Sequence, residues 1–159
     1  MKSNWHQKMM RVNYKDTDQM GVGHHANYVT WFEMGRTECM RHHGIAYREM
    51  EKLGLFLPVL NLDVNYKKPA YYDDCLAIFT RVVEFSKVRL AFEYEARRVD
   101  YNKLEQDTQQ SSEAEPYGEL LASGHTLHMW LNHDWKPTRL DRVTPEIYNL
   151  LRSILNKDD

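Results

Sequence analysis

The chain has 159 residues, 42% of them hydrophobic and 12% aromatic, and a formal net charge of −2 at pH 7. This length fits one ordinary globular core, so a single domain over residues 1–159 is expected. The charge gives no general attraction to phosphate backbones, and no basic stripe is interleaved with aromatic residues, which argues against nucleic acid as a partner. No window approaches the roughly 20 apolar residues of a transmembrane helix, so a membrane span is not expected.

The N-terminus and the cysteines indicate the compartment. Residues 1–11 carry charged and amide side chains without an apolar stretch followed by small residues, unlike a cleaved secretory signal. Cys39 and Cys75 have neither the number nor the spacing of a disulfide framework or a zinc site, and are interpreted as buried or incidental thiols. A cytoplasmic protein is therefore expected.

The first half of the chain predicts one strand and two helices. Loose alternation over residues 8–14 predicts the strand, and a loop with two glycines follows it. The spacing then becomes helical, with Asn27 as the expected N-cap and Gly44 as the residue that ends the helix. The apolar stripe of this helix comprises Tyr28, Trp31, Phe32, Gly35 and Cys39. A short second helix is expected over residues 46–52.

The second half predicts mainly strands. Period-two alternation predicts strands over residues 60–66, 76–82, 88–97 and 120–131. The polar segment 102–116, rich in Gln, Ser and Glu, is predicted to be a long, mobile hairpin loop. Thr144 is the expected cap of a C-terminal helix over residues 144–156, with Pro145 in its first position. Together these elements predict an α+β fold: a five-stranded antiparallel sheet wrapped around a long central helix, plus a C-terminal helix.

The densest polar cluster lies between the first strand and the long helix. It comprises Tyr14, Asp16, Thr17, Asp18, Gly21, Gly23, His24, His25 and Asn27. A loop before a helix N-terminus offers unpaired backbone N–H groups that can receive a developing negative charge. A nearby carboxylate could attack a carbonyl group or activate a water molecule, so the arrangement suits acyl chemistry.

The same cluster also has a purely structural interpretation. Aspartates and glycines before a helix commonly form turns and caps, and Asp16 is assigned that role. The adjacent pairs His24 with His25 and His42 with His43 lack the i, i+4 spacing of a helical zinc site. No metal or other cofactor is therefore expected. Spacing alone favours the structural interpretation of the loop over the catalytic one.

The run from Tyr14 to Tyr28, Tyr-Lys-Asp-Thr-Asp-Gln-Met-Gly-Val-Gly-His-His-Ala-Asn-Tyr, resembles a known signature. It is similar to that of the 4-hydroxybenzoyl-CoA thioesterase branch of the hotdog-fold acyl-CoA thioesterases, in particular the YbgC-like bacterial subgroup. The resemblance extends over roughly residues 8–140 and includes Leu57-Pro58-Val59, Lys68-Pro69-Ala70 and Phe92-Glu93-Tyr94. It implies the hotdog fold, hydrolysis of acyl-CoA to free acid and CoA, and a homodimer or homotetramer with active sites between subunits.

Catalytic roles follow from this resemblance. Asp18 matches the catalytic carboxylate, acting as nucleophile or general base. His25 matches the position whose backbone N–H polarises the thioester carbonyl, and in the bacterial subgroup its side chain is also implicated. Tyr14 matches a supporting residue. The chain departs from the family pattern at the loop 102–116, which is longer than the usual hairpin, and at His24, which replaces an aromatic residue.

Substrate binding gives a second set of candidates. CoA phosphates need cationic or N–H partners, and the basic residues near predicted strand ends are Lys67, Lys68, Lys87 and Arg89. Asn27 and Tyr28, at the start of the helix, are expected to contact the substrate. Tyr28 could line an apolar slot for the acyl group or equally belong to the core.

Other functions remain open at this point. A hotdog dehydratase or hydratase would use an Asp-x-x-x-x-His pattern, whereas seven positions separate Asp18 from His25. A non-catalytic module that binds acyl-CoA or acyl carrier protein is a second alternative. A scaffold that serves only oligomerisation is the third. Thioesters of acyl carrier protein are also a candidate second substrate class for a thioesterase.

Overall fold

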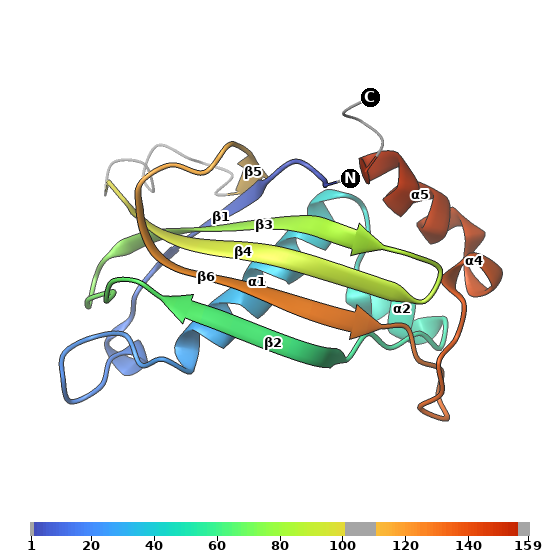
Figure 1. The fold of residues 1–159 in the computed structure, drawn as a ribbon, viewed down its shortest axis with the longest axis horizontal. Coiled ribbons are helices and arrows are strands. Elements are labelled where there is room, and N and C mark those ends of the chain that lie inside the picture. Colours follow the sequence, from blue (N-terminus) through green and yellow to red (C-terminus); the bar gives the residue numbers. More distant parts are fainter. Residues whose placement is uncertain (1, 101–110, 156–159) are drawn as a thin grey trace.

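The computed structural model describes residues 2–100 and 111–155. Its main elements form one antiparallel sheet and several helices, with the long helix α1 behind the sheet in Figure 1. In chain order they are β1 (His6–Arg11), α1 (Asn27–His42), α2 (Tyr47–Lys52), β2 (Val59–Tyr66), β3 (Cys75–Phe85), β4 (Arg89–Val99), β5 (Ser111–Glu113), β6 (Glu119–Met129), α4 (Leu140–Val143) and α5 (Pro145–Leu155). The predicted α+β arrangement of a sheet around a central helix is confirmed.

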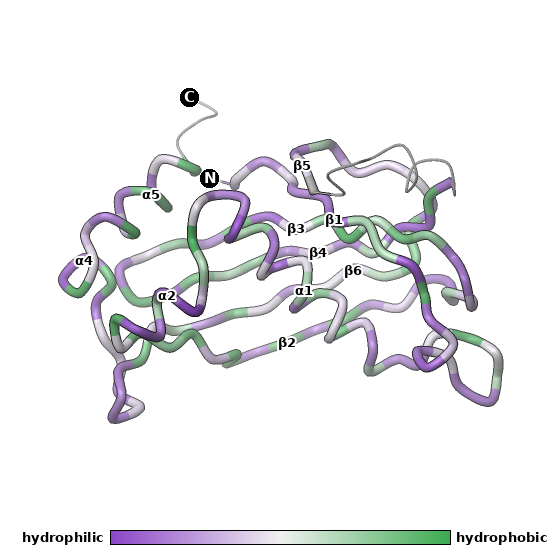
Figure 2. Tube along the Cα trace, turned by 180° about the vertical axis from the view of Figure 1, so that it is seen from behind, coloured by the Kyte–Doolittle hydropathy of each residue, from purple (hydrophilic) through white to green (hydrophobic). Residues whose placement is uncertain are grey.

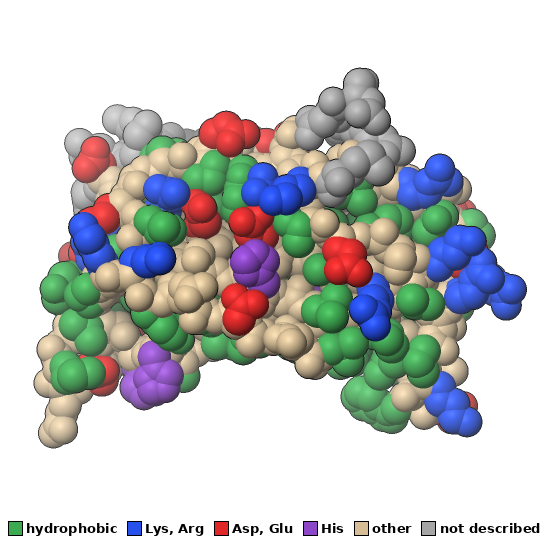
Figure 3. All heavy atoms as spheres, viewed as in Figure 1, with side chains coloured by type: hydrophobic (Ala, Val, Ile, Leu, Met, Phe, Trp, Pro, Cys, Tyr) green, Lys and Arg blue, Asp and Glu red, His purple; other side chains and the backbone are tan. Residues whose placement is uncertain are grey.

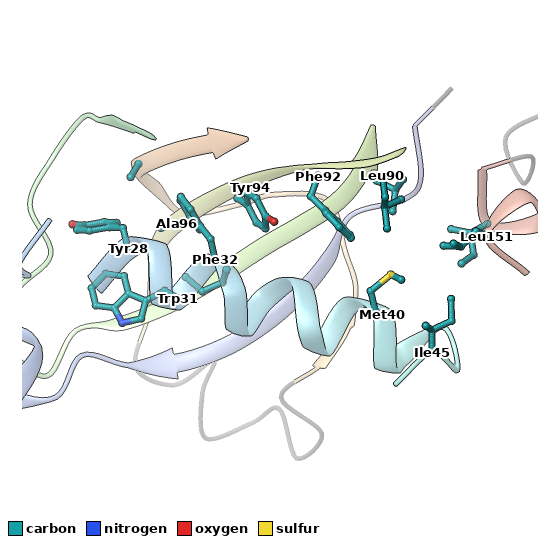
Figure 4. Close-up of a cluster of buried hydrophobic side chains, with 14 of the residues drawn as sticks. Tyr28, Trp31, Phe32, Met40, Ile45, Leu90, Phe92, Tyr94, Ala96 and Leu151 are labelled. Atoms are coloured by element: carbon teal, nitrogen blue, oxygen red, sulfur yellow. The ribbon is translucent and has the colours of Figure 1, made fainter. Parts of the chain in front are cut away.

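The core lies between α1 and the inner face of the sheet. The helix buries all five residues of the predicted stripe, and it buries Met40 in addition. In Figure 4 the side chains of Phe32 and Met40 point toward β4, and the Phe32 ring stacks on Tyr94 with 4.8 Å between centroids. Gly35 lets the helix approach β3, because a Cβ atom there would lie 2.7 Å from atoms of both Ile78 and Thr80. The helical spacing of apolar residues thus determines which face of α1 meets the sheet.

The sheet has six strands in the order β2-β6-β4-β3-β1-β5, so the prediction of five strands was wrong. The additional strand, β5, pairs antiparallel with β1 and lies inside the segment predicted as a loop. Three residues are too few for a recognisable period-two pattern, and their pairing with β1 depends on a contact distant in sequence. The part of the predicted loop at residues 101–110 lies outside the described residues.

Smaller differences concern the ends of the helices. Helix α1 begins at Asn27 with Ala26 in the cap position, so the predicted N-cap was off by one residue. Gly44 follows the helix with a φ of +86°, a conformation that favours glycine. Helix α5 begins at Pro145 as predicted and is described to Leu155, whereas residue 156 of the predicted helix lies outside the described residues. Helix α4 was not predicted.

The two faces and edges of the sheet differ in character. The outer face carries many charged side chains (Figure 3), among them the ion pair of Arg81 with Glu93 at 2.7 Å. Among the described strands, β2 forms one edge of the sheet and pairs with β6 rather than with β3, which follows it in sequence. Its apolar side chains Val59, Leu60 and Leu62 are 39–49% exposed.

No helix in the described part of the chain is long and apolar enough to cross a membrane.

The loop between β1 and α1 lies at one end of the molecule. Seen from behind in Figure 2, it is at the opposite end from α2, α4 and α5. The predicted polar cluster therefore sits where α1 begins, and the C-terminal helices sit near the other end of α1.

Candidate active site

The loop before α1 forms a tight hairpin. Thr17 and Gly23 make an isolated antiparallel bridge. Inside it, the N–H of Asp18 donates to the carbonyl oxygen of Val22 at 3.0 Å, and the N–H of Gly21 donates to the carbonyl oxygen of Asp18 at 3.0 Å. Gly21 has a φ of +79°, which a residue with a side chain rarely adopts. Backbone hydrogen bonds therefore fix the position of Asp18.

This hairpin is attached to the core by its last glycine. The N–H of Gly23 donates to the carbonyl oxygen of Ala70 at 2.7 Å. A Cβ atom at Gly23 would lie 3.2 Å from the Trp31 ring, so a small residue suits this close approach. The N–H of Ala70 in turn donates to the Tyr28 hydroxyl at 3.3 Å. The loop, the start of α1 and the segment after β2 are thus one connected unit.

The residues just before α1 leave one amide available. The N–H of His24 donates to the carbonyl oxygen of Asp16 at 2.8 Å, and the N–H of Ala26 donates to Nδ1 of His24 at 3.2 Å. The N–H of His25 has no hydrogen-bond acceptor within residues 2–100 and 111–155. Its carbonyl oxygen accepts a hydrogen bond from the Tyr66 hydroxyl at 2.8 Å. The His25 peptide is therefore held through its C=O while its N–H can serve a ligand.

A pocket of about 300 Å³ opens beside this amide. Its walls come from the hairpin loop, the start of α1 and the end of β2, and they are formed by Asp18, Met20, Val22, Gly23, His25, Tyr28, Tyr66, Lys67, Lys68 and Pro69. Asp18 is half-buried, and its Oδ1 accepts a hydrogen bond from the Met20 N–H at 2.9 Å. Its Oδ2 has no hydrogen-bond or ion-pair partner among the described residues, so this oxygen can face a substrate.

The charge and polarity of the pocket come from tyrosines and lysines. Burial raises the pKa of the Tyr28 and Tyr66 hydroxyls, so both stay protonated and can donate hydrogen bonds at neutral pH. The Nζ atom of Lys68 lies 2.9 Å from a carboxylate oxygen of Glu119. Lys67 has no acidic partner in the described part of the chain, so its charge is available to an anion.

The structure brings together part of the predicted site. Asp18, His25, Tyr28 and Lys68 all line the pocket. Tyr14 does not: it is 79% exposed and meets the ring of Tyr72 edge-on with 5.9 Å between centroids. Asn27 also lies outside the lining, and its Nδ2 donates to the carbonyl oxygen of Asp16 at 2.7 Å, which ties the loop to the helix. Catalytic and binding roles for Tyr14 and Asn27 stay predictions.

Lys87 and Arg89 lie at the other end of the sheet. Lys87 is in the turn between β3 and β4, where its carbonyl oxygen accepts a hydrogen bond from the Leu140 N–H at 2.8 Å. Arg89 opens β4 opposite Met129 of β6. Neither residue lines the pocket that contains Asp18 of the same chain. Their contact with CoA therefore stays a prediction.

Sequence reasoning missed Tyr66 as a site residue. It was assigned only as the last position of a strand, and its contact with His25 spans 41 residues of sequence. One signal was available, because Tyr66 stands at the end of a predicted strand, directly before Lys67-Lys68-Pro69. An aromatic side chain in such a position can contact a neighbouring loop. Met20 and Val22, which complete the apolar wall, carried no such signal.

Comparison with known proteins gives consistent results. The family model described as “Thioesterase superfamily” matches residues 20–104. YneP of Bacillus subtilis, provisionally named an acyl-CoA thioesterase, is 30% identical over 140 residues, which cover 87% of this chain and 89% of that protein. The acyl-CoA thioester hydrolase YbgC of Escherichia coli O157:H7 is 37% identical over 83 residues, covering 52% of this chain and 62% of that protein. The crystal structure of a DHNA-CoA thioesterase from Staphylococcus aureus superposes with a TM-score of 0.81 at 31% identity, covering 98% of this chain and 95% of that one.

Proposed function

This chain belongs to the thioesterase superfamily, and we propose on that premise that it hydrolyses acyl-CoA thioesters to a free acid and CoA. The observation that supports this reaction is that Asp18 and His25 line the same pocket and that the N–H of His25 has no acceptor among the described residues. A carboxylate supplies the nucleophile or base, and a fixed N–H at a helix start stabilises an oxyanion. The pocket thus holds both chemical functions that thioester hydrolysis requires.

Two routes to the products fit this geometry. In the first, Asp18 attacks the thioester carbonyl carbon, the C–S bond breaks with loss of the CoA thiolate, and water hydrolyses the anhydride that remains; in the second, Asp18 takes a proton from a water molecule that attacks the same carbon. In both routes the carbonyl oxygen becomes negatively charged and accepts a hydrogen bond from the His25 N–H. The CoA thiolate then leaves, and the positive end of the α1 dipole favours the oxyanion at this position.

The pocket also suggests how the rest of the substrate binds. Met20, Val22 and Tyr28 provide an apolar wall next to the reacting carbon, which suits an acyl group. Lys67 and Lys68 lie on the rim, where they would bind phosphate groups of CoA. Acyl carrier protein presents its acyl group on a similar phosphate-bearing arm and is a second substrate class in this proposal.

We also propose that two copies associate along the free edge of β2. Within residues 2–100 and 111–155, the outer N–H and C=O groups of this strand pair with no other strand, and an apolar edge of this kind favours pairing with a strand of another chain. Tyr66 ends β2 and lines the pocket, so a second copy on this edge would lie next to the pocket. Light scattering on the purified protein should give at least twice the chain mass, and Leu60→Lys should lower it to that of one chain.

A hydrolysis assay tests the proposed reaction. The purified protein is incubated with short-chain, long-chain and aromatic acyl-CoAs, and the release of free thiol is followed. Asp18→Asn should lower kcat by about 100- to 10,000-fold, the range typical of a positioned acid or base. Asp134→Asn is the matched control, since Asp134 is an exposed carboxylate on the loop after β6 without an ion pair among the described residues.

Other results would favour the alternative functions. Absence of thiol release across the panel from a folded protein, together with tight acyl-CoA binding in a calorimeter, would identify a binding module. A change in enoyl-CoA absorbance without thiol release would identify a hydratase or dehydratase. Equal loss of activity in Asp18→Asn and Asp134→Asn would remove Asp18 from the mechanism.

A further inference from the structure

A second cluster of polar side chains lies at the C-terminal end of α1. His42 is the last residue of the helix, and His43 follows it in the C-cap position. His6 of β1 and Glu113 of β5 are direct cross-strand partners in the antiparallel register. Three elements that are far apart in sequence therefore place histidines and a carboxylate at one corner of the sheet. None of these residues belongs to the pocket around Asp18.

The distances in this cluster are short. The ligand atoms of His42, His43 and Glu113 all lie within 4.8 Å of one another. Nε2 of His42 is 3.6 Å from a carboxylate oxygen of Glu113. The ring of His6, which is fully buried, lies beneath them with 5.2 Å between its centroid and that of His42. The corner thus combines three imidazoles and one carboxylate.

We propose that His42, His43 and Glu113 bind a divalent transition metal ion such as Zn²⁺, with His6 beneath them. Zinc sites in proteins use imidazole nitrogens and carboxylate oxygens at about 2.0–2.2 Å. Bonds of this length need the three ligand atoms to move closer together. His42 and Glu113 are exposed, so their side chains can move toward His43, which is half-buried.

Two further features support a cation at this corner. The carbonyl groups at the C-terminal end of a helix carry partial negative charge, which favours a bound cation. Within the described ranges, this is the one group of three His, Cys, Asp or Glu residues whose ligand atoms are close enough to share an ion. The adjacent pair His24 and His25, stacked at 4.2 Å, lacks such a third partner.

The expected role of the ion is structural. Helix α1 has 16 residues, so the cluster lies about 24 Å along the helix from the pocket. A bound ion would connect β5 to the end of α1, in addition to the backbone pairing of β5 with β1. Ions that bind only the folded state stabilise it by mass action. The inference is independent of the proposed hydrolysis.

Calorimetric titration of the untagged protein with ZnCl₂ tests this site. One ion per chain should bind with a micromolar or lower Kd, and the same titration with Co²⁺ should produce the visible absorption of a cobalt ion with nitrogen ligands. The thermal unfolding midpoint should rise with Zn²⁺ and fall back on addition of a chelator.

Variants locate the binding residues. His42→Ala and Glu113→Gln should each weaken Zn²⁺ binding at least tenfold, and circular dichroism should confirm that both remain folded, as expected for exposed positions. His133→Ala is the matched control, because His133 is an exposed histidine on the loop after β6. No binding at 100 µM Zn²⁺, unchanged affinity in both cluster variants, or an equal loss in His133→Ala would each overturn the proposal.

Discussion

The two ends of α1 carry the same dipeptide in different surroundings. His24 and His25 precede the helix, and His42 and His43 close it. At the first end the important groups are a fixed backbone N–H and the Asp18 carboxylate, which suit a developing negative charge. At the second end the side chains meet Glu113 and His6, which suit a cation. On both proposals, the helix dipole and the tertiary neighbours, rather than the dipeptide, would determine the chemistry at each end.

Both ends depend on the packing of the helix between them. Figure 4 shows this middle region, where Phe32 and Met40 of α1 face β4. A polar network crosses it: Arg36 donates to the Tyr94 hydroxyl at 3.2 Å, and Tyr94 contacts the Thr126 hydroxyl at 2.5 Å. Variants along α1 and in its surroundings therefore test whether one rigid helix holds both ends and whether each end behaves as its neighbours indicate.

Gly35→Ala should destabilise the protein by about 2–3 kcal/mol, because the added methyl group would overlap Ile78 and Thr80 of β3. Urea unfolding followed by tryptophan fluorescence and by circular dichroism measures the change. The two probes should report one common transition if both ends share a rigid helix. Thr30→Ala, at an exposed position of the same helix, should change the stability by less than about 0.5 kcal/mol. Two separate transitions would show that the ends of α1 unfold independently.

His128 is a third kind of histidine, buried in the middle region instead of exposed at an end. Burial and then the nearby Arg36 charge lower its pKa from 6.5 to about 4. Between these values the unfolded chain binds a proton that the folded chain does not, so stability is constant above about pH 6.5 and falls below it. The loss should reach about 2 kcal/mol by pH 5.

Unfolding of His128→Gln at several pH values tests this dependence. The variant should lose about half of the slope between pH 6.5 and 5, because burial lowers the pKa of His6 to about 4 as well and His6 contributes the rest. The variant can be less stable at every pH, since it lacks the bond from His128 to Thr126. His125→Gln is the matched control, since His125 is exposed on the same strand. An unchanged slope in His128→Gln would mean that other groups cause the acid sensitivity.

Tyr66→Phe should lower kcat about tenfold with little change in KM. The variant keeps the edge-on ring contact with Tyr28 but loses the hydroxyl that donates to the His25 carbonyl oxygen. The His25 peptide would then be held less firmly when its N–H meets the oxyanion. Steady-state kinetics separates the two parameters. Tyr71→Phe, which changes an exposed tyrosine on the segment after β2, should behave like the wild type. A rise in KM alone would make Tyr66 a binding residue.

Sequence patterns predicted the parts of this structure that depend on neighbouring residues. The helical stripe that begins at Tyr28, and Gly44 with its positive φ, follow from local spacing and backbone geometry. The resemblance of the loop motif supplied Asp18 and His25, which the structure places in one pocket. Contacts between distant segments were not predicted: β5 is too short to recognise, and Tyr66 reaches His25 only through the fold. The partners of His42 were missed for the same reason, since spacing within α1 says nothing of β1 or β5.

Lys67→Gln should raise KM for acyl-CoA about threefold and leave kcat unchanged. An exposed cation contributes little binding energy, and salt screens it, so the effect should be largest at low ionic strength. Kinetics at several salt concentrations measures it, with Lys136→Gln in the exposed loop after β6 as the control. Lys87→Gln provides the sharper comparison. If Lys87→Gln raises KM as much as Lys67→Gln does, the phosphates of CoA must also contact Lys87, at the far end of the sheet. A CoA molecule bound in the pocket at the start of α1 does not reach that end of the same chain. The phosphate site would then include a second copy of the chain.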